Sequence, residues 1–283
     1  MISRIITFGD SFTEGDGAWL EKTNKIEEQY EDSSAGRYEV SKFNYQYSWP
    51  KILGDNLDIT VSNEGSSGAS NYRIFNRVFH YDLTGNIDSE CLVVVMWSST
   101  VRDKLPFFPT LFQDQGPIGL GWSYKELLEQ HSAKSNFLTR YYNDDKNKEY
   151  IEGVLSPFMG DYFKKFTVNC YDESYYNMLN FNYVYFLQEF FKFKGCDYIF
   201  IDGFESMNTF DSDYKKWDLI DKSKYWKFGE STAWDFLNNI GGDVFENLEL
   251  SYNPPGQKCH PNRHGYKLIG EEIANFYKKS LSI

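Results

Sequence analysis

A continuous apolar run, Cys91–Trp97 (CLVVVMW), is the feature that most constrains the fold of this chain. The run has the length of a β-strand and carries no charged or amide side chain on either face. A strand of this kind is buried on both faces, which is typical of the centre of a parallel sheet covered by helices. The sequence therefore predicts an α/β protein with helices on both sides of a parallel sheet.

The rest of the chain alternates between strand-like and helix-like patterns. Pro50 suits the first turn of a helix over Trp49–Leu57, and apolar residues recur at helical spacing between residues 72 and 79. A long helix over Glu173–Lys194 would end at Gly195, since glycine is favoured just past a helix. The further predicted strands are residues 3–8, 58–63 and 196–202, and a last helix is predicted after His260. This βαβ order predicts a three-layer α/β/α sandwich around the central parallel sheet.

Three stretches interrupt the alternation. Residues 13–47 are polar and have no clear period, so they are predicted to be a loop or a partly helical insertion. Residues 102–169 are too long for a plain connection and are predicted to be an inserted, cap-like region. Residues 209–239 are acidic and aromatic, and are predicted to be loop with short helices. We expect residues 1–283 to form a single domain that includes the 102–169 insertion.

Charge and composition disfavour several classes of partner. The formal net charge is −12 and no run of Lys or Arg is longer than a pair, so we expect neither nucleic-acid nor membrane binding. No apolar stretch approaches the ~20 residues of a membrane span, and no signal peptide is recognised before the first strand. The four cysteines are far apart and form no CxxC pair, which favours reduced thiols over a disulfide framework or a zinc site. Aromatic residues make up 19% of the chain, which is typical either of surfaces that bind sugars or of a coding bias towards Phe and Tyr.

The first predicted strand stops at Gly9-Asp10-Ser11. A hydroxyl in this place lies at the carboxyl end of the sheet, where open α/β folds bind their ligands. Ser11 is therefore a candidate nucleophile. The alternative is that Asp10 or Ser11 only caps a short helix.

Nucleophilic chemistry at a serine also needs a base and donors for the oxyanion. His260, in a polar loop before the last helix, can lie over the same edge of the sheet and act as the base. The glycine turn of residues 63–68 follows the second predicted strand and can point a backbone N–H into the site. A rival interpretation pairs His260 with His264 as metal ligands, but Pro261 and Gly265 disfavour a helical ligand pair, and we expect no metal.

Together these segments resemble the SGNH, or GDSL-type, serine hydrolases. GDSFTEG is similar to the first block of the family, which implies that Ser11 is the nucleophile. Asn63-x4-Gly68 is similar to the second block, which implies that the Gly68 N–H is an oxyanion donor beside the Ser11 N–H. The segment from His260 to Tyr266 is similar to the last block, with His260 as general base. The resemblance implies a flavodoxin-like three-layer fold and no cofactor.

The third block of the family departs from its pattern in this chain. Members carry Gly-x-Asn-Asp after a central strand, whereas residues 97–100 read WSST, which places Ser99 at the position of the oxyanion Asn. The Ser99 hydroxyl is shorter than an Asn amide, and either Arg102 or Asn71 could take over its role. We expect Asp10, Asn71 and Arg102 to contribute to the substrate site.

The last block departs as well, because Gln257 stands where the family has an Asp three residues before the His. An amide oxygen can still accept from the imidazole and fix its tautomer, but it supplies no negative charge. We expect Gln257 to orient His260. Another acid, such as Glu249 or Asp243, is an alternative that the sequence does not place.

We expect a cofactor-independent serine esterase that cleaves small acyl esters, most plausibly O-acetyl groups on a carbohydrate. Its partner would be a small-molecule or glycan ester. Because no signal peptide is recognised, we expect a cytoplasmic or virion-associated location. The virion alternative arises because the WSS segment is also similar to family members from tailed bacteriophages. Two alternatives stay open. One is a catalytically impaired member that binds glycans or a protein, and the other is an O-acyltransferase with the same residues.

Overall fold

The computed structural model describes residues 2–18, 44–98, 173–204, 206–207, 215–241, 251–252 and 260–281. Its centre is a five-stranded sheet in the order β2-β1-β3-β4-β5, and all neighbouring strands are parallel. The strands are β1 (Arg4–Gly9), β2 (Thr60–Gly65), β3 (Cys91–Trp97), β4 (Asp197–Asp202) and β5 (Tyr225–Trp226). This strand order is that of the flavodoxin-like fold.

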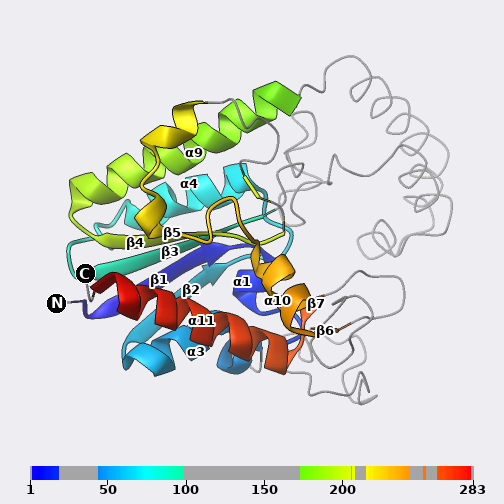
Figure 1. Cartoon of the computed structure of the whole chain (residues 1–283). Coiled ribbons are helices and arrows are strands. Elements are labelled where there is room, and N and C mark those ends of the chain that lie inside the picture. The colour runs from blue at the N-terminus through cyan, green and yellow to red at the C-terminus, as the bar shows by residue number, and fades with distance from the viewer. Residues whose placement is uncertain are drawn as a thin grey trace, which may run out of the picture.

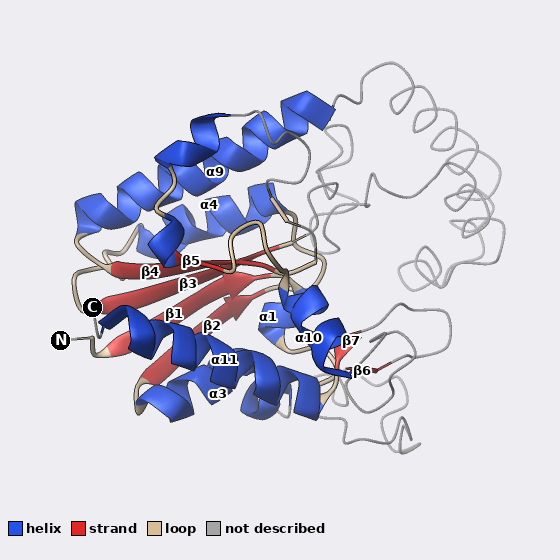
Figure 2. Ribbon diagram, in the orientation of Figure 1, coloured by secondary structure: helices blue, strands red, loops and turns tan. Residues whose placement is uncertain are grey.

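Helices cover both faces of the sheet (Figures 1 and 2). On one face lie α3 (Trp49–Leu57) and α11 (Arg263–Leu281), and on the other lie α4 (Asn71–Asp82) and α9 (Glu173–Lys194). The predicted three-layer α/β/α sandwich is therefore confirmed.

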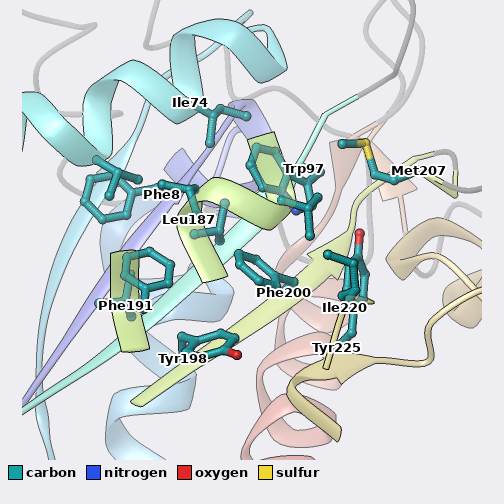
Figure 3. Close-up of a cluster of buried hydrophobic side chains, with 14 of the residues drawn as sticks. Phe8, Ile74, Trp97, Leu187, Phe191, Tyr198, Phe200, Met207, Ile220 and Tyr225 are labelled. Atoms are coloured by element: carbon teal, nitrogen blue, oxygen red, sulfur yellow. The ribbon is translucent and has the colours of Figure 1, made fainter. Parts of the chain in front are cut away.

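The central strand β3 explains why both layers are needed. Its alternate side chains Leu92, Val94 and Met96 belong to the core under α3 and α11. Val93 and Trp97 belong to the second core, under α4 and α9, which Figure 3 shows in close-up. All five side chains are fully buried, so a polar residue at any of these positions would lose its hydration on one side of the sheet or the other.

Short pairings account for the differences from the sequence-based prediction. The described part of residues 209–239 contains two 3₁₀ helices, η3 (Lys215–Leu219) and η4 (Lys222–Lys224), followed by the two-residue strand β5. The helix α10 (Ala233–Gly241) begins in the same stretch. The expected loop at His260 is instead the strand β7 (His260–Pro261), which pairs antiparallel with β6 (Ser251–Tyr252). Two residues are too few to show an alternating pattern, so these strands leave no signal in the sequence.

The segments that carry Ser11 and His260 lie at the carboxyl ends of the strands (Figure 1). The short helix α1 (Ser11–Glu14), α10 and the β6–β7 pair lie at this edge, while both chain termini lie at the opposite edge (Figure 1). The predicted insertion at 102–169 lies outside the described residues, and so does most of the 13–47 stretch. No helix in the described part of the chain is both long and apolar enough to span a membrane.

A buried carboxyl group ends β4 at the same edge. Asp202 is 2% exposed, the Tyr225 hydroxyl donates to its Oδ1, and the Met207 N–H donates to its Oδ2 at 3.2 Å. Burial raises the pKa of this carboxyl to about 7, although the Tyr225 and Met207 hydrogen bonds oppose the rise.

Asp202 should therefore make the protein less stable as the pH rises. In the unfolded chain an Asp titrates near pKa 3.9, whereas in the native protein the proton is held up to about pH 7. The contribution of the protonated group is complete below the unfolded pKa and is lost as the pH rises through about 7. We would measure the free energy of unfolding of wild type and of Asp202→Asn by urea denaturation at about pH 5 and about pH 8. The value for Asp202→Asn minus the value for wild type should be larger at about pH 8 than at about pH 5. Asp218→Asn, on exposed η3, is the control, and parallel pH curves for wild type and Asp202→Asn would contradict this account.

Candidate active site

The β1–α1 turn places Ser11. Asp10, in extended conformation, is the N-cap of α1, and its Oδ1 accepts from the Phe12 N–H at 3.0 Å. Capping is thus performed by Asp10 and not by Ser11. At Gly9 an added Cβ would lie 1.9 Å from Thr13 Oγ1 and 3.0 Å from the Met96 carbonyl oxygen, so only glycine lets the chain turn here.

His260 meets Ser11 from the other end of the chain. Its Nε2 lies 2.8 Å from Ser11 Oγ, across a sequence separation of 249 residues. On one side His260 is held by the pairing of β7 with β6. On the other side Asn262 begins α11, because its Oδ1 accepts from the backbone N–H groups of His264 and Gly265 at 3.0 and 3.1 Å. The structure therefore brings the predicted nucleophile and base into hydrogen-bond contact.

Aromatic rings surround this contact. The Phe12 ring centroid lies 5.7 Å from that of His260, 4.1 Å from that of Phe204 and 5.7 Å from that of Trp234. Ser11 itself is only 3% exposed. A polar contact bordered by such rings competes with little water, which strengthens the interaction between imidazole and hydroxyl. Neither Phe204 nor Trp234 was identified as a site residue from the sequence, since both lie in segments without a clear pattern.

The predicted oxyanion turn lies beside the Ser11 turn. Gly9 of β1 pairs with Gly65 of β2, and the Ser66 N–H donates to the Gly9 carbonyl at 3.0 Å. Gly68 has φ +70°, a conformation that favours glycine. Within the described residues, neither the Ser11 N–H nor the Gly68 N–H has a protein acceptor.

Asn63 braces the base of this turn. Its Nδ2 donates to the Thr13 carbonyl at 2.7 Å, and its Oδ1 accepts from the Gly65 N–H at 3.0 Å and the Thr7 hydroxyl at 3.2 Å. One side chain thus links β1, β2 and α1. The Asn of the second motif is a structural residue of the site in this protein.

Asp10 and Asn71 meet at Ser98, the residue after β3. The Ser98 hydroxyl donates to Asp10 Oδ2 at 2.6 Å, and the Ser98 N–H donates to Asn71 Oδ1 at 2.8 Å. Asn71 Nδ2 in turn faces the Ser98 carbonyl at 3.3 Å and Asn180 Oδ1 at 3.2 Å. All four residues are at least nine-tenths buried. The structure therefore gives both expected substrate-site side chains protein partners at the edge of the site. Ser98 was not identified as a site residue from the sequence, although WSS places a serine directly after the buried strand.

Several predicted site residues lie outside the described part of the chain. They are Ser99, Arg102 and Gln257, together with the alternative acids Asp243 and Glu249. Their roles stay predictions. His264 is exposed on α11, and the described residues contain no cluster of three or more His, Cys, Asp or Glu that could hold a metal ion.

No protein-family model and no curated protein matches this chain. Three solved structures align with it over nearly its whole length. A member of the lipolytic protein G-D-S-L family from Veillonella parvula is 15% identical, with a TM-score of 0.42, over 98% of this chain and 98% of that chain. A structure from Desulfitobacterium hafniense, also named for the lipolytic G-D-S-L family, is 15% identical, with a TM-score of 0.30, over 97% of this chain and 99% of that one. A structure from Agrobacterium tumefaciens, named as an arylesterase, is 10% identical, with a TM-score of 0.33, over 98% of this chain and 99% of that one. TM-scores at this level add no functional argument to the geometry described above.

Asn71→Ala should destabilise the protein, because it removes the side chain that pairs with both the buried N–H and the buried carbonyl of Ser98. We expect a loss of about 2–4 kcal/mol in the free energy of unfolding, measured by urea denaturation. Asn76→Ala on the same helix removes only an exposed bond from Nδ2 to the Tyr72 carbonyl, so it should change stability by no more than about 0.5 kcal/mol. Equal losses in the two variants would show that the Asn71–Ser98 pairing carries no special weight.

Proposed function

We propose that this chain is a serine hydrolase of the SGNH type that cleaves carboxylic esters. The observation that carries the proposal is the 2.8 Å contact between His260 Nε2 and the buried Ser11 Oγ. The Asp10 cap supports it, since it leaves the Ser11 hydroxyl to the imidazole. The backbone N–H groups of Ser11 and Gly68 supply the donors that such chemistry needs.

The first half-reaction forms an acyl-enzyme. His260 Nε2 accepts the Ser11 proton while Ser11 Oγ attacks the ester carbonyl, and the carbonyl π electrons move to its oxygen. The Ser11 and Gly68 N–H groups donate to this oxyanion. When the tetrahedral intermediate collapses, the bond to the alkoxy oxygen breaks, and His260 gives its proton to the leaving alcohol.

The second half-reaction restores the enzyme. Water takes the place of the alcohol and loses a proton to His260 as it attacks the acyl carbon. Collapse of the second intermediate breaks the bond to Ser11 Oγ, which recovers the proton from His260, and the carboxylic acid leaves. No metal or organic cofactor takes part in either half. In an acyltransferase the same steps would occur with a sugar hydroxyl in place of water, and transfer products in the presence of sugar acceptors would reveal it.

For the substrate we propose a small acyl ester, in particular an O-acetyl group on a carbohydrate. The support is the set of rings beside the dyad. Phe12 lies beside His260 and is backed by the rings of Phe204 and Trp234, and this bulk favours a short acyl group. Phe204 is only partly buried, and an exposed aromatic face can pack against the C–H groups of a sugar ring.

Ser11→Ala and His260→Ala should each lower kcat/KM for p-nitrophenyl acetate by at least about 10³-fold, because either change removes the nucleophile–base unit. Both variants should also fail to react with a fluorophosphonate probe, which labels active serines. His264→Ala is the matched control, since it removes an exposed histidine four residues from His260.

Two results would overturn the proposal. One is a correctly folded wild-type protein that neither reacts with the probe nor turns over the ester. The other is turnover that survives in Ser11→Ala. The first result would favour the alternative of a catalytically impaired glycan- or protein-binding module, and glycan arrays would then identify its ligand.

Acyl length tests the substrate proposal separately. We expect kcat/KM for p-nitrophenyl acetate to exceed that for p-nitrophenyl palmitate by at least about tenfold, a factor that corresponds to a barrier difference of about 1.4 kcal/mol. The rates would be measured with both esters below their solubility limits. Faster hydrolysis of the long chain would contradict the small-acyl assignment while leaving the esterase assignment intact.

A further inference from the structure

Two carboxylates accept hydrogen bonds from the turn that carries Gly68. The Ser67 N–H donates to Oε2 of Glu14, the last residue of α1. The Ser67 hydroxyl donates to Asp16 Oδ2 at 2.8 Å. Glu14, Asp16 and Ser67 are here called the carboxylate clamp. None of the three was singled out from the sequence as a site residue.

We infer that Glu14 and Asp16 are positioning residues that fix the Gly68 N–H relative to the Ser11 hydroxyl. This inference rests on the proposed function, because it assigns the clamp to the oxyanion donor of that reaction. Neither carboxylate touches the reacting atoms. Both act through Ser67, the residue that precedes Gly68 in the chain.

The clamp hydrogen bonds involve Ser67, the residue directly before Gly68. Nucleophile and oxyanion donor come from different turns, and their relative placement must hold to a fraction of an ångström for efficient catalysis. The bond from the Ser66 N–H to the Gly9 carbonyl ties the start of the turn to β1. Beyond Ser66 the chain is exposed at Ser67 and reaches Gly68 at φ +70°. The two clamp bonds fix Ser67, and with it the peptide that bears the Gly68 N–H.

The other half of the clamp is tied directly to the nucleophile. The Asp16 N–H donates to the Ser11 carbonyl at 3.0 Å, and the Asp16 carbonyl accepts from the buried Tyr266 hydroxyl at 2.8 Å. At Gly65 an added Cβ would lie 2.3 Å from the Glu14 nitrogen, so α1 and the turn are in direct backbone contact. A short connected path therefore runs from Ser11 through Asp16 and Ser67 to Gly68.

The clamp brings like charges together, which costs stability. Burial raises the pKa of Asp16 to about 6, and the neighbouring Asp10 charge adds to the rise, while the Ser67 hydrogen bond opposes it. Burial and the Asp16 charge also raise the pKa of Glu14, against the Ser67 N–H and the cations Arg77 and Arg73. An arrangement kept only for stability would avoid such a pair, whereas perturbed carboxyl groups are common where function sets the geometry.

Glu14→Ala and Ser67→Ala separate positioning from stability. We expect Glu14→Ala to lower kcat for p-nitrophenyl acetate by about 10- to 100-fold, because the Gly68 N–H loses its fixed place. KM should stay within about twofold, since the ground-state ester gains little from a donor aimed at the oxyanion. Ser67→Ala keeps the N–H bond to Glu14 and should show a smaller loss. Glu14→Gln retains an acceptor and should recover part of the rate.

The melting temperature supplies the second readout. Removing one of two mutually repelling carboxylates should leave the melting temperature of Glu14→Ala unchanged or higher at neutral pH. The matched control is Asp221→Ala. Asp221 Oδ1 accepts from the Ser223 N–H at 3.0 Å and from the Ser223 hydroxyl at 2.6 Å, so it binds the same two kinds of serine donor as the clamp. Asp221 caps η4, whose Lys224 pairs with Asp197 at the amino end of β4, so kcat should be unaffected.

The outcomes distinguish this inference from the proposed function. Wild-type protein that does not react with fluorophosphonate would refute both. Reactive wild type with unchanged kcat in Glu14→Ala and Ser67→Ala would refute the clamp alone. A loss of kcat that matches a lower melting temperature, or that glutamine at position 14 does not relieve, would assign the clamp a structural role instead.

Discussion

The buried carboxyl group of Asp10 is the group on which the end of the sheet that carries Ser11 depends. One of its oxygens accepts the Phe12 N–H and shapes the turn that presents Ser11, and the other accepts the Ser98 hydroxyl at the end of β3. A buried carboxylate is tolerated only when hydrogen bonds replace its hydration, and here they come from two strands' ends. The Ser98 N–H in turn donates to the side chain of Asn71 at the start of α4. The ends of β1 and β3 and the first turn of α4 are thus linked through the hydrogen bonds of a single side chain and Ser98.

Much of the fold could be predicted because its signals are local. Trp49–Leu57, Cys91–Trp97 and Glu173–Lys194 were each predicted with the bounds that the structure shows. An early proline, an unbroken apolar run and a terminal glycine are written in the segments themselves. The two-residue strands β5 and β7 were missed, since their existence depends on partners elsewhere in the chain.

The site divides in the same way. Ser11 and His260 were predicted as a pair, and the structure brings them together, because their motifs mark both residues. That Asp10 rather than Ser11 caps α1 could not be decided, since both residue types are good caps. The Ser67 contacts with Glu14 and Asp16 depend on the register of β1 with β2, about 50 residues apart in the chain, and no local pattern encodes it. Ser99, Arg102 and Gln257 lie outside the described residues, so their predicted roles rest on the motifs alone.

The separation of 249 residues between nucleophile and base has a consequence for biosynthesis. Ser11 is synthesised before His260, and the two residues can meet only once α11 has packed beside α3 and β7 has paired with β6. Contacts between distant segments form late, because closing a long loop costs entropy before any contact repays it. The contact between Ser11 Oγ and His260 Nε2 therefore forms only after these pairings are in place. The contact joins the first helix of the described fold to the strand before its last helix, so its presence reports that both of these segments are in place.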